Sequence, residues 1–402
     1  MGPSPYPDPV TTLEVTITGV VAGGDGLARA DDGKVVFVTG ALPGERVTAE
    51  VTDDRGGFAR AALTDVLDPS PDRVAPPCRH VARGCGGCGW QHVAPHAQPA
   101  LKVAVVVDAL RRIGRIDEPA VVAGPVLVDG GRTTVRGAVV DGRFGFRRRR
   151  SHDVVTVDDC AVTHPMLADL VADGRFHGAT EVTLRAGAGT GERLVLAQPT
   201  AARVQVPDDV VLVGTDELKR GRHAWYHEEV AGRRWRISAT SFFQARPDGA
   251  DALVDAVRAA TADRPGDGAL IDLCCGVGLF AATVCAGRPV VGLERHGPAV
   301  HDARHNLADL DVRLVRAGLD RWRPSPADVV IADPARSGPG AKAVRSVAAT
   351  GASRVVLVSC DPAALGRDAR LLHEHGYRLV SSTLVDMFPQ TPHIEVVSRF
   401  DR

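Results

Sequence analysis

The sequence predicts an α/β fold with a doubly wound parallel sheet in its C-terminal part, preceded by a small β-barrel and a mostly-β middle region. After Ser241, continuous apolar runs alternate with helical stretches, as expected for strands that are buried on both faces between crossover helices. From Thr11 to Leu67, valine-rich runs are broken by turn residues roughly every eight to twelve residues. This spacing is typical of a small antiparallel barrel.

The C-terminal sheet is defined by its strands and by the helices between them. The expected strands are 268–275, 288–294, 311–317, 327–334 and 353–360, and the clearest helices are 298–310 and 363–376. Ligands of such sheets bind at the carboxyl ends of the strands. A functional site is therefore expected at that edge.

The middle region has one expected helix, 96–114, and several short β-like runs. These runs are 132–140, 152–159, 179–186 and 193–198. The proline-rich stretch 70–77 separates this region from the barrel. We expect a barrel over residues 1–70, a central region over 71–235 and the α/β domain over 236–402.

Composition excludes several protein classes. The 402 residues include 48 Lys+Arg and 49 Asp+Glu, the net charge is -1 and 44% of residues are hydrophobic. A disordered chain, a collagen and a strongly basic tail do not fit these values. No apolar run approaches the roughly 18 residues of a membrane span, and residues 1–10 lack the features of a signal peptide. We expect a cytoplasmic protein.

A local run of arginines ends at Arg150, in the sequence RFGFRRRR. A solvated surface explains such a run most simply. Arginine also binds phosphate groups through two hydrogen bonds and stacks on bases, so the run is a candidate contact for nucleic acid.

A glycine-rich turn, IDLCCGVGLF, follows the first expected strand of the sheet, and Glu294 closes the second. Glycines let the backbone approach a ligand, and an acid at this spacing can accept hydrogen bonds from ribose hydroxyls. The pattern alone leaves NAD and S-adenosylmethionine open. The motif DPAR, starting at Asp333 after a later strand, favours S-adenosylmethionine.

Cys360 ends the strand VVLVSC and is followed by an Asp-Pro turn. A buried structural cysteine is the usual alternative, but a thiol at a strand terminus beside a cofactor site can act as a nucleophile. A thiolate that adds to C6 of a pyrimidine activates C5 for methylation, and a base must then remove the C5 proton. Glu395, which interrupts the apolar run IEVV, is the candidate base.

Cys78, Cys85 and Cys88 form a C-x6-C-x2-C cluster, and Cys160 can supply a fourth ligand. Four thiolates bind zinc and also bind iron–sulfur clusters, so the spacing leaves both open. Metal ligation is nevertheless the expected role, because chance placement explains such a cluster poorly.

In their order along the chain, SFFQ, DLCCGVG, GLE, DPAR, SCDP and DMFPQTPHIE resemble the RNA uracil-C5 methyltransferase family, which makes 5-methyluridine in tRNA or ribosomal RNA. The resemblance covers nearly the whole chain. The N-terminal GGDGLARADDGKVVFVTG is similar to a TRAM domain, a small OB-like RNA-binding barrel, and CGGCGWQH is similar to the subfamily that carries a [4Fe-4S] cluster.

The resemblance implies a Rossmann-like class I methyltransferase domain and a role for individual residues. Cys360 would be the nucleophile and Glu395 the base, and Cys78, Cys85, Cys88 and Cys160 would bind the [4Fe-4S] cluster. The residues implied in binding S-adenosylmethionine are Gln244, Cys274, Gly276, Gly278, Glu294 and Asp333.

The implied substrate is structured RNA, most closely the large-subunit (23S) ribosomal RNA, with tRNA as the alternative, and the implied state is a monomer. Two rival functions stay open: a noncatalytic RNA-binding or folding factor that retains the cluster, and an NAD-dependent oxidoreductase that relays electrons through it.

The chain departs from the family pattern at several positions. The first cysteine spacing is longer by one residue, and SCDP stands where SCNP is usual. The other departures are Cys274, Leu279 and Arg246. They bear on cofactor affinity and leave the nucleophile and the base intact.

Overall fold

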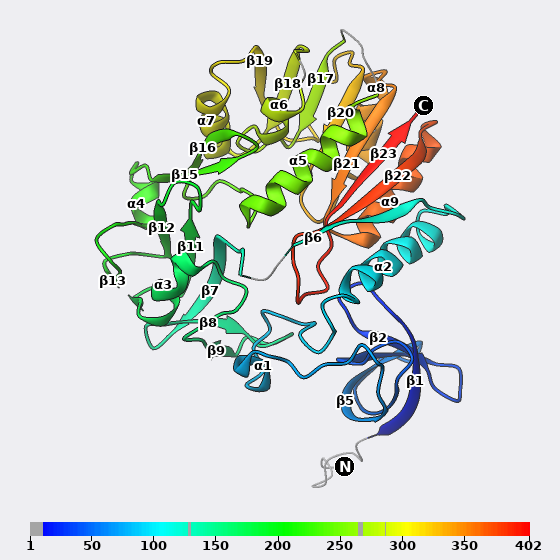
Figure 1. Cartoon of the computed structure of the whole chain (residues 1–402). Helices are drawn as coiled ribbons and strands as arrows, with labels where there is room; N and C mark the ends of the chain where they lie inside the picture. The colour runs from blue at the N-terminus through cyan, green and yellow to red at the C-terminus, as the bar shows by residue number, and fades with distance from the viewer. Residues whose placement is uncertain (1–10, 128–129, 264–267, 286) are drawn as a thin grey trace, which may run out of the picture.

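The computed structural model describes residues 11–127, 130–263, 268–285 and 287–402; the segment examined for a signal peptide lies outside these ranges. Figure 1 shows three regions: the barrel in blue at the lower right, a central sheet in green at the left and a large sheet at the upper right. The loop that joins β22 (Arg378–Asp386) to β23 (Val396–Asp401) lies in the middle, between the three regions.

The N-terminal region is a closed barrel in the order β1-β2-β3-β5-β4. Its strands are β1 (Thr12–Val20), β2 (Gly26–Arg29), β3 (Val35–Thr39), β4 (Arg46–Asp54) and β5 (Phe58–Asp68). Alternate side chains such as Val36 and Val38 are fully buried. This alternation gives the barrel its own core. The predicted barrel is confirmed, but it is not fully antiparallel, because β3 and β5 pair in parallel.

The segment after the barrel carries three of the clustered cysteines and two helices, α1 (Arg79–Ala82) and α2 (Gln98–Arg112). One face of α2 is buried and carries Val105, Val106, Ala109 and Leu110. Helix α2 packs against α9 (Pro362–Glu374) of the large sheet. It therefore joins the first half of the chain to the last.

The central region is a six-stranded sheet in the order β14-β12-β11-β7-β8-β9. Its strands are β7 (Thr134–Val140), β8 (Arg143–Arg147), β9 (Val154–Thr156), β11 (Glu181–Ala186), β12 (Arg193–Gln198) and β14 (Val210–Gly214). A small pair, β10 (Arg175–His177) and β13 (Arg203–Gln205), lies beside it with η1 (Pro165–Leu167), α3 (Ala168–Ala172) and α4 (Thr215–Lys219).

The C-terminal sheet has the order β19-β18-β17-β20-β21-β23-β22-β6. Its parallel strands are β17 (Leu270–Leu273), β18 (Val290–Glu294), β19 (Val312–Arg316), β20 (Val329–Ala332) and β21 (Arg354–Ser359). The associated elements are the hairpin β15 (Trp225–Val230) and β16 (Arg233–Ser238) with α5 (Pro247–Thr261), α6 (Leu279–Thr283), α7 (Gly297–Asn306) and α8 (Gly340–Ala349). The predicted strand and helix alternation is confirmed.

Strand β6 (Val121–Val126) belongs to the large sheet, where it pairs in parallel with β22. It lies within the 71–235 range that the sequence assigns to the central region. The two regions are therefore not separated by a single cut in the chain.

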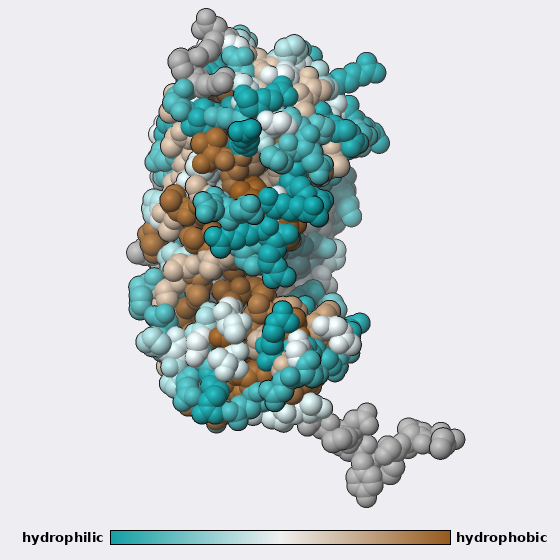
Figure 2. All heavy atoms as spheres, turned by 90° about the vertical axis from the view of Figure 1, so that its right-hand side faces the viewer, coloured by the Kyte–Doolittle hydropathy of each residue, from teal (hydrophilic) through white to brown (hydrophobic). Residues whose placement is uncertain are grey.

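None of the described helices is both long enough and apolar enough to cross a membrane. On the face shown in Figure 2, apolar areas are divided by hydrophilic ones. Exposed apolar side chains include Val122, Val126 and Val380 on β6 and β22, at one edge of the large sheet.

Candidate active site

The carboxyl ends of neighbouring strands bring the predicted site residues to one edge of the large sheet. Glu294 is the last residue of β18, Cys274 follows β17, Asp333 follows β20 and Cys360 follows β21. These strands are adjacent in the sheet. The parallel topology, rather than sequence proximity, therefore assembles the site.

The glycine-rich turn after β17 adopts left-handed backbone conformations at Cys274 (φ 62°), Gly276 (φ 55°) and Gly278 (φ 101°). A Cβ on Gly278 would lie 2.9 Å from Leu307 Cδ1, so this position requires glycine. The Gly276 backbone N–H donates to Glu294 Oε2 at 3.1 Å. This bond ties the turn to the end of β18.

Two buried carboxyls line the same edge. Burial raises the pKa of Asp272 to about 8 and the pKa of Asp333 to about 7. Asp272 Oδ2 accepts from the Ala281 N–H at 2.8 Å, and Gln244 Nε2 donates to Asp333 Oδ2 at 3.5 Å. Gln244 and Asp333, which the resemblance implies in cofactor binding, are thus in contact with each other.

The SFFQ loop that carries Gln244 is held by Asp302, a fully buried residue of α7. Asp302 Oδ2 accepts from the Ser241 hydroxyl at 2.6 Å and from the Ser238 N–H at 2.8 Å. Asp302 Oδ1 accepts from the Ser238 hydroxyl at 2.7 Å. One carboxylate therefore fixes both the end of β16 and the start of this loop.

Cys360 and Glu395 lie at the same end of an antiparallel pair. Ser359 of β21 pairs with Val396 of β23, and the next residues outward are Cys360 and Glu395. Since β23 lies between β21 and β22, Glu395 is not on an edge strand, and only 6% of it is exposed. The sequence-predicted pair is brought together, and its carboxyl faces the protein interior.

The electrostatics of this pair are set by burial and by Arg336 of the DPAR motif. Burial raises the pKa of the Cys360 thiol to about 11; the nearby Glu395 adds to this shift and the Arg336 guanidinium opposes it. Burial also raises the pKa of Glu395 well above its ordinary range, while Arg336 acts in the opposite direction. Arg336 is thus the cation that favours the ionised form of both groups.

The four clustered cysteines line one pocket, together with Arg132, Gln91 and Phe146. Among the described residues, a single group of His, Cys, Asp or Glu side chains has three ligand atoms that all lie within 4.8 Å of one another. This group is His80, Asp158 and Asp159. No three of the cysteine sulfurs are therefore that close. Around a tetrahedral zinc, with Zn–S bonds of about 2.3 Å, the sulfurs would lie roughly 3.8 Å apart. The sulfurs are thus not gathered around a single-ion position, and the four-thiolate donor set is one that zinc and iron–sulfur clusters share.

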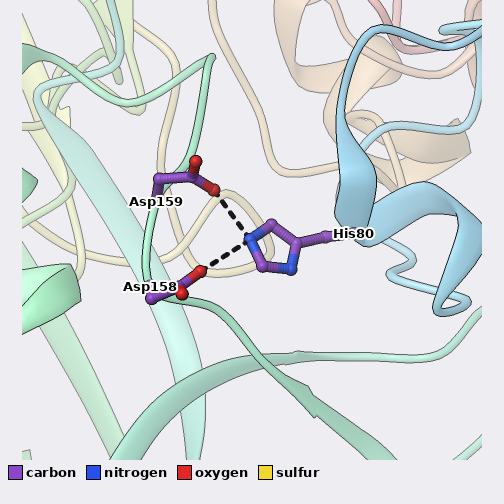
Figure 3. Close-up of side chains that lie close together, drawn as sticks. All are labelled: His80, Asp158 and Asp159. Atoms are coloured by element: carbon purple, nitrogen blue, oxygen red, sulfur yellow. Dashed lines mark hydrogen bonds and ion pairs between the residues drawn. The ribbon is translucent and has the colours of Figure 1, made fainter.

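His80, Asp158 and Asp159 form a contact between the two cysteine segments (Figure 3). His80 Nε2 lies 2.7 Å from Asp159 Oδ1 and 3.1 Å from Asp158 Oδ1. Arg79 Nη2 also lies 2.7 Å from Asp158 Oδ1. Because His80 and Arg79 already contact these carboxylates, the group joins the segment of Cys78 to the segment of Cys160 rather than presenting free ligands.

The arginine run makes contacts within the protein. Arg149 Nη2 and Arg150 Nη2 lie 2.9 Å and 2.6 Å from the buried carboxylate of Asp25 in the barrel. Arg147 Nη1 lies 3.1 Å from His152 Nδ1. The run therefore holds the central region against the barrel. The exposed parts of the arginine side chains are the parts that a ligand could contact.

Sequence reasoning missed Asp272, Asp302 and Arg336. Asp272 and Arg336 lie inside the recognised motifs DLCCGVG and DPAR, so their motif membership was an available signal. Asp302 lies in a helix with no such motif, and only its contacts with Ser238 and Ser241 reveal it.

The chain is similar to known RNA methyltransferases over nearly its whole length. Residues 9–64 match the TRAM domain. An uncharacterized RNA methyltransferase from Streptomyces avermitilis is 39% identical, over 96% of this chain and 97% of its own length. The 23S rRNA (uracil(1939)-C(5))-methyltransferase RlmD of Alkalilimnicola ehrlichii is 32% identical, over 98% and 97%.

Among solved structures, the Pyrococcus abyssi tRNA (uracil-54, C5)-methyltransferase, in complex with S-adenosyl-L-homocysteine, has a TM-score of 0.72 and 22% identity. The match covers 96% of this chain and 100% of that chain. It supports the fold from the barrel to the large sheet.

The TRAM barrel, the parallel sheet with its acid-lined edge and these relatives define an RNA methyltransferase. Within that class, the chain belongs to the RNA uracil-C5 methyltransferase family.

Proposed function

We propose that this chain transfers the methyl group of S-adenosylmethionine to C5 of a uridine in structured RNA, with 23S ribosomal RNA as the expected substrate. The placement of Cys360 opposite Glu395, at the strand edge that carries the acid-lined turn, is the observation that supports this function. The names of the RlmD relatives support the choice of ribosomal RNA.

S-adenosylmethionine supplies an electrophilic methyl group when bound. Glu294 would accept hydrogen bonds from the ribose hydroxyls, and its position at the end of the strand next to the turn supports this role. Cys274, Gly276 and Gly278 would let the backbone approach the cofactor. Gln244 and Asp333, which contact each other, would complete its site.

Methylation at C5 requires a nucleophile and a base that act on the same uracil. The Cys360 thiolate adds to C6, and the resulting electron-rich C5 takes the methyl group. Glu395 then removes the C5 proton, and the released electron pair restores the C5–C6 double bond and expels the thiolate. Arg336 assists the first step because its charge favours the thiolate.

For the cysteine pocket we propose a [4Fe-4S] cluster bound by Cys78, Cys85, Cys88 and Cys160, because all four cysteines line one pocket and CGGCGWQH resembles the subfamily that carries this cluster. Its proposed role is structural, since the methyl transfer described above uses no electron relay. An RNA substrate is also consistent with a cytoplasmic location.

The decisive experiment maps 5-methyluridine by mass spectrometry in tRNA and both ribosomal RNAs from cells with and without the gene. Loss at a 23S position is expected. Loss in tRNA would keep the reaction and overturn the substrate. If nothing is lost, the purified, anaerobically prepared protein is assayed on unmodified RNA, and inactivity there would favour the noncatalytic RNA-binding factor.

Variants then test the two catalytic residues. Cys360→Ala should abolish turnover, and Glu395→Gln should accumulate a covalent protein–RNA adduct that migrates slowly on denaturing gels. Cys285→Ser is the matched control, because Cys285 is a half-buried cysteine of the same domain outside the site. Without an adduct in the Glu395 variant, its role in proton removal is wrong.

A further inference from the structure

The loop from Asp386 to Glu395 ends at the proposed base, but much of its support comes from outside the large sheet. Figure 1 shows this loop in dark red beside α2 and the segments that follow the barrel. At the sheet end, Glu395 is fixed through its carbonyl, which accepts from the Val385 N–H at 2.8 Å. The groups that hold the rest of the loop lie in residues 90–132.

Gln98, at the start of α2, holds Gln390. The Gln390 N–H donates to Gln98 Oε1 at 2.7 Å, and Gln98 Nε2 donates to Gln390 Oε1 at 3.2 Å. Gln390 has a φ of 65°, a left-handed conformation that is unfavourable for a residue with a side chain. Such a conformation persists only where the surroundings fix it. The fully buried amide of Gln98 is one of those surroundings.

Trp90 connects the same loop to the barrel and to the cysteine segment. Its backbone N–H donates to the Gln390 carbonyl at 2.9 Å, and its indole N–H donates to the Gly24 carbonyl at 3.3 Å. A Cβ on Gly24 would lie 2.4 Å from Trp90 Nε1 and 2.7 Å from Pro392 Cβ. The barrel, the cysteine segment and the loop therefore meet at Trp90, which lies two residues after Cys88.

Two cations complete the contact. Lys102 Nζ donates to Asp386 Oδ1 at 2.6 Å and to the Phe388 carbonyl at 2.9 Å, and its side chain is fully buried. The Arg132 guanidinium lies 5.6 Å from the centre of the Phe388 ring. Arg132 also lines the cysteine pocket, and the His164 N–H, near Cys160, donates to its carbonyl.

Phe388 connects these contacts to Glu395, the proposed base. Its ring contacts His393 edge-to-face, with centroids 6.0 Å apart, and His393 is two residues before Glu395. Burial lowers the pKa of His393 to about 4, so its ring stays neutral and packs against Phe388 as an uncharged group. Movement of Phe388 would displace His393 and the chain that leads to Glu395.

We infer that Trp90, Gln98 and Arg132 are positioning residues for Glu395: they hold the Asp386–Glu395 loop so that the carboxylate meets the C5 proton. This inference rests on the proposed function and deepens it, because it assigns the cysteine-bearing segment a part in the second half of the reaction. Bond formation by Cys360 occurs at the end of β21, which none of the loop contacts described above includes.

The test compares the rate at which the methylated covalent adduct forms with the rate of the proton removal that resolves it. It uses holoprotein with confirmed iron content, unmodified RNA and S-adenosylmethionine. In Gln98→Ala and Arg132→Ala, proton removal should slow by about tenfold or more, since general bases contribute at least this much. The methylated covalent adduct should then accumulate, as in Glu395→Gln, with S-adenosylmethionine affinity unchanged. Gln205→Ala, an exposed glutamine on β13, is the control and should match the parent protein.

The outcomes separate the two proposals. If Glu395→Gln gives an adduct but Gln98→Ala and Arg132→Ala lose turnover without one, these residues serve only stability and the inference is wrong. If Glu395→Gln gives none, the proposed chemistry itself fails. Should Gln98→Ala not fold, Gln98→Asn keeps the amide but shortens its reach, and Arg132→Lys keeps the charge without the planar stack. Adduct accumulation is expected in both.

Discussion

Cys360 and Glu395 are in register across the end of the β21–β23 pair, one residue beyond the pairing of Ser359 with Val396. An antiparallel pair places such residues opposite one another, with side chains on the same face. A ladder of backbone hydrogen bonds thus fixes the distance between the two backbones at this point, while the Asp386–Glu395 loop holds the Glu395 side chain. The charges of Cys360 and Glu395 are consequently coupled, which leads to the first prediction.

The reactivity of the Cys360 thiol should respond oppositely to its two charged neighbours. With a pKa of about 11, its alkylation by iodoacetamide should rise steadily from pH 7 to pH 9. Glu395→Gln should speed the reaction and Arg336→Gln should slow it, because Glu395 raises the pKa of the thiol and Arg336 lowers it. Peptide mass spectrometry measures the rate, with Cys285 as internal reference. Equal rates in all three proteins would contradict the coupling.

Asp272 should make stability depend on pH. Its folded-state pKa of about 8 exceeds the ordinary 3.8, so the folded protein binds the extra proton between these values and stability falls as pH rises through this window. A single such group contributes roughly 1 kcal/mol per pH unit. Asp272→Asn should flatten the fall in the guanidinium midpoint between pH 5 and pH 8. An unchanged slope would show that Asp272 is ionised in the folded protein.

Asp302 should affect cofactor binding at a distance, through Ser238 and Ser241. Asp302→Ala removes these bonds and frees the loop of Gln244, so S-adenosylmethionine affinity should fall by roughly tenfold, as expected for lost charge-assisted hydrogen bonds. Titration calorimetry measures the affinity. Asp309→Ala removes an exposed acid just after the same helix and should have little effect. Similar affinities in the two variants would rule out this role.

Asp25 should hold the barrel against the central region. Its carboxylate is almost fully buried and contacts Arg60, Arg149 and Arg150, so Asp25→Ala should cost roughly 1–3 kcal/mol of unfolding free energy. Chemical denaturation measures this loss. The control is Asp53→Ala, which removes an exposed barrel carboxylate paired only locally with Arg55. If the two variants lose equal stability, the interdomain contact contributes nothing.

Much of the fold was predictable because its signals are local. The apolar runs before Asp333 and Cys360 are strands whose ends define the site edge, and parallel topology follows from their alternation with helices. The barrel was predictable from valine-rich runs broken by turn residues. The order of motifs then placed Glu294, Asp333 and Cys360 at neighbouring strand ends.

The remainder depends on contacts between distant segments. No local sequence pattern predicts these contacts, because each joins residues that are far apart in the chain. Examples are the pairing of Ser359 with Val396, the bonds from Gln98 to Gln390 and the ion pair of Lys102 with Asp386. The arginine run shows the same limit. Its composition left a solvated surface and a nucleic-acid contact open, and neither predicts that the run contacts the buried carboxylate of Asp25 in the barrel.

Strand β6 gives the protein an unusual order of assembly. The ribosome completes β6 and α2 long before it makes β22, the strand that β6 pairs with in the finished sheet. The large sheet cannot be completed while only the first half of the chain exists. In a fragment that begins at residue 236, β22 would lack its partner β6 and would be an exposed edge strand, which is prone to aggregation. We therefore expect gene fusions or truncations that preserve the chemistry of the last domain to need α2 and β6 as well.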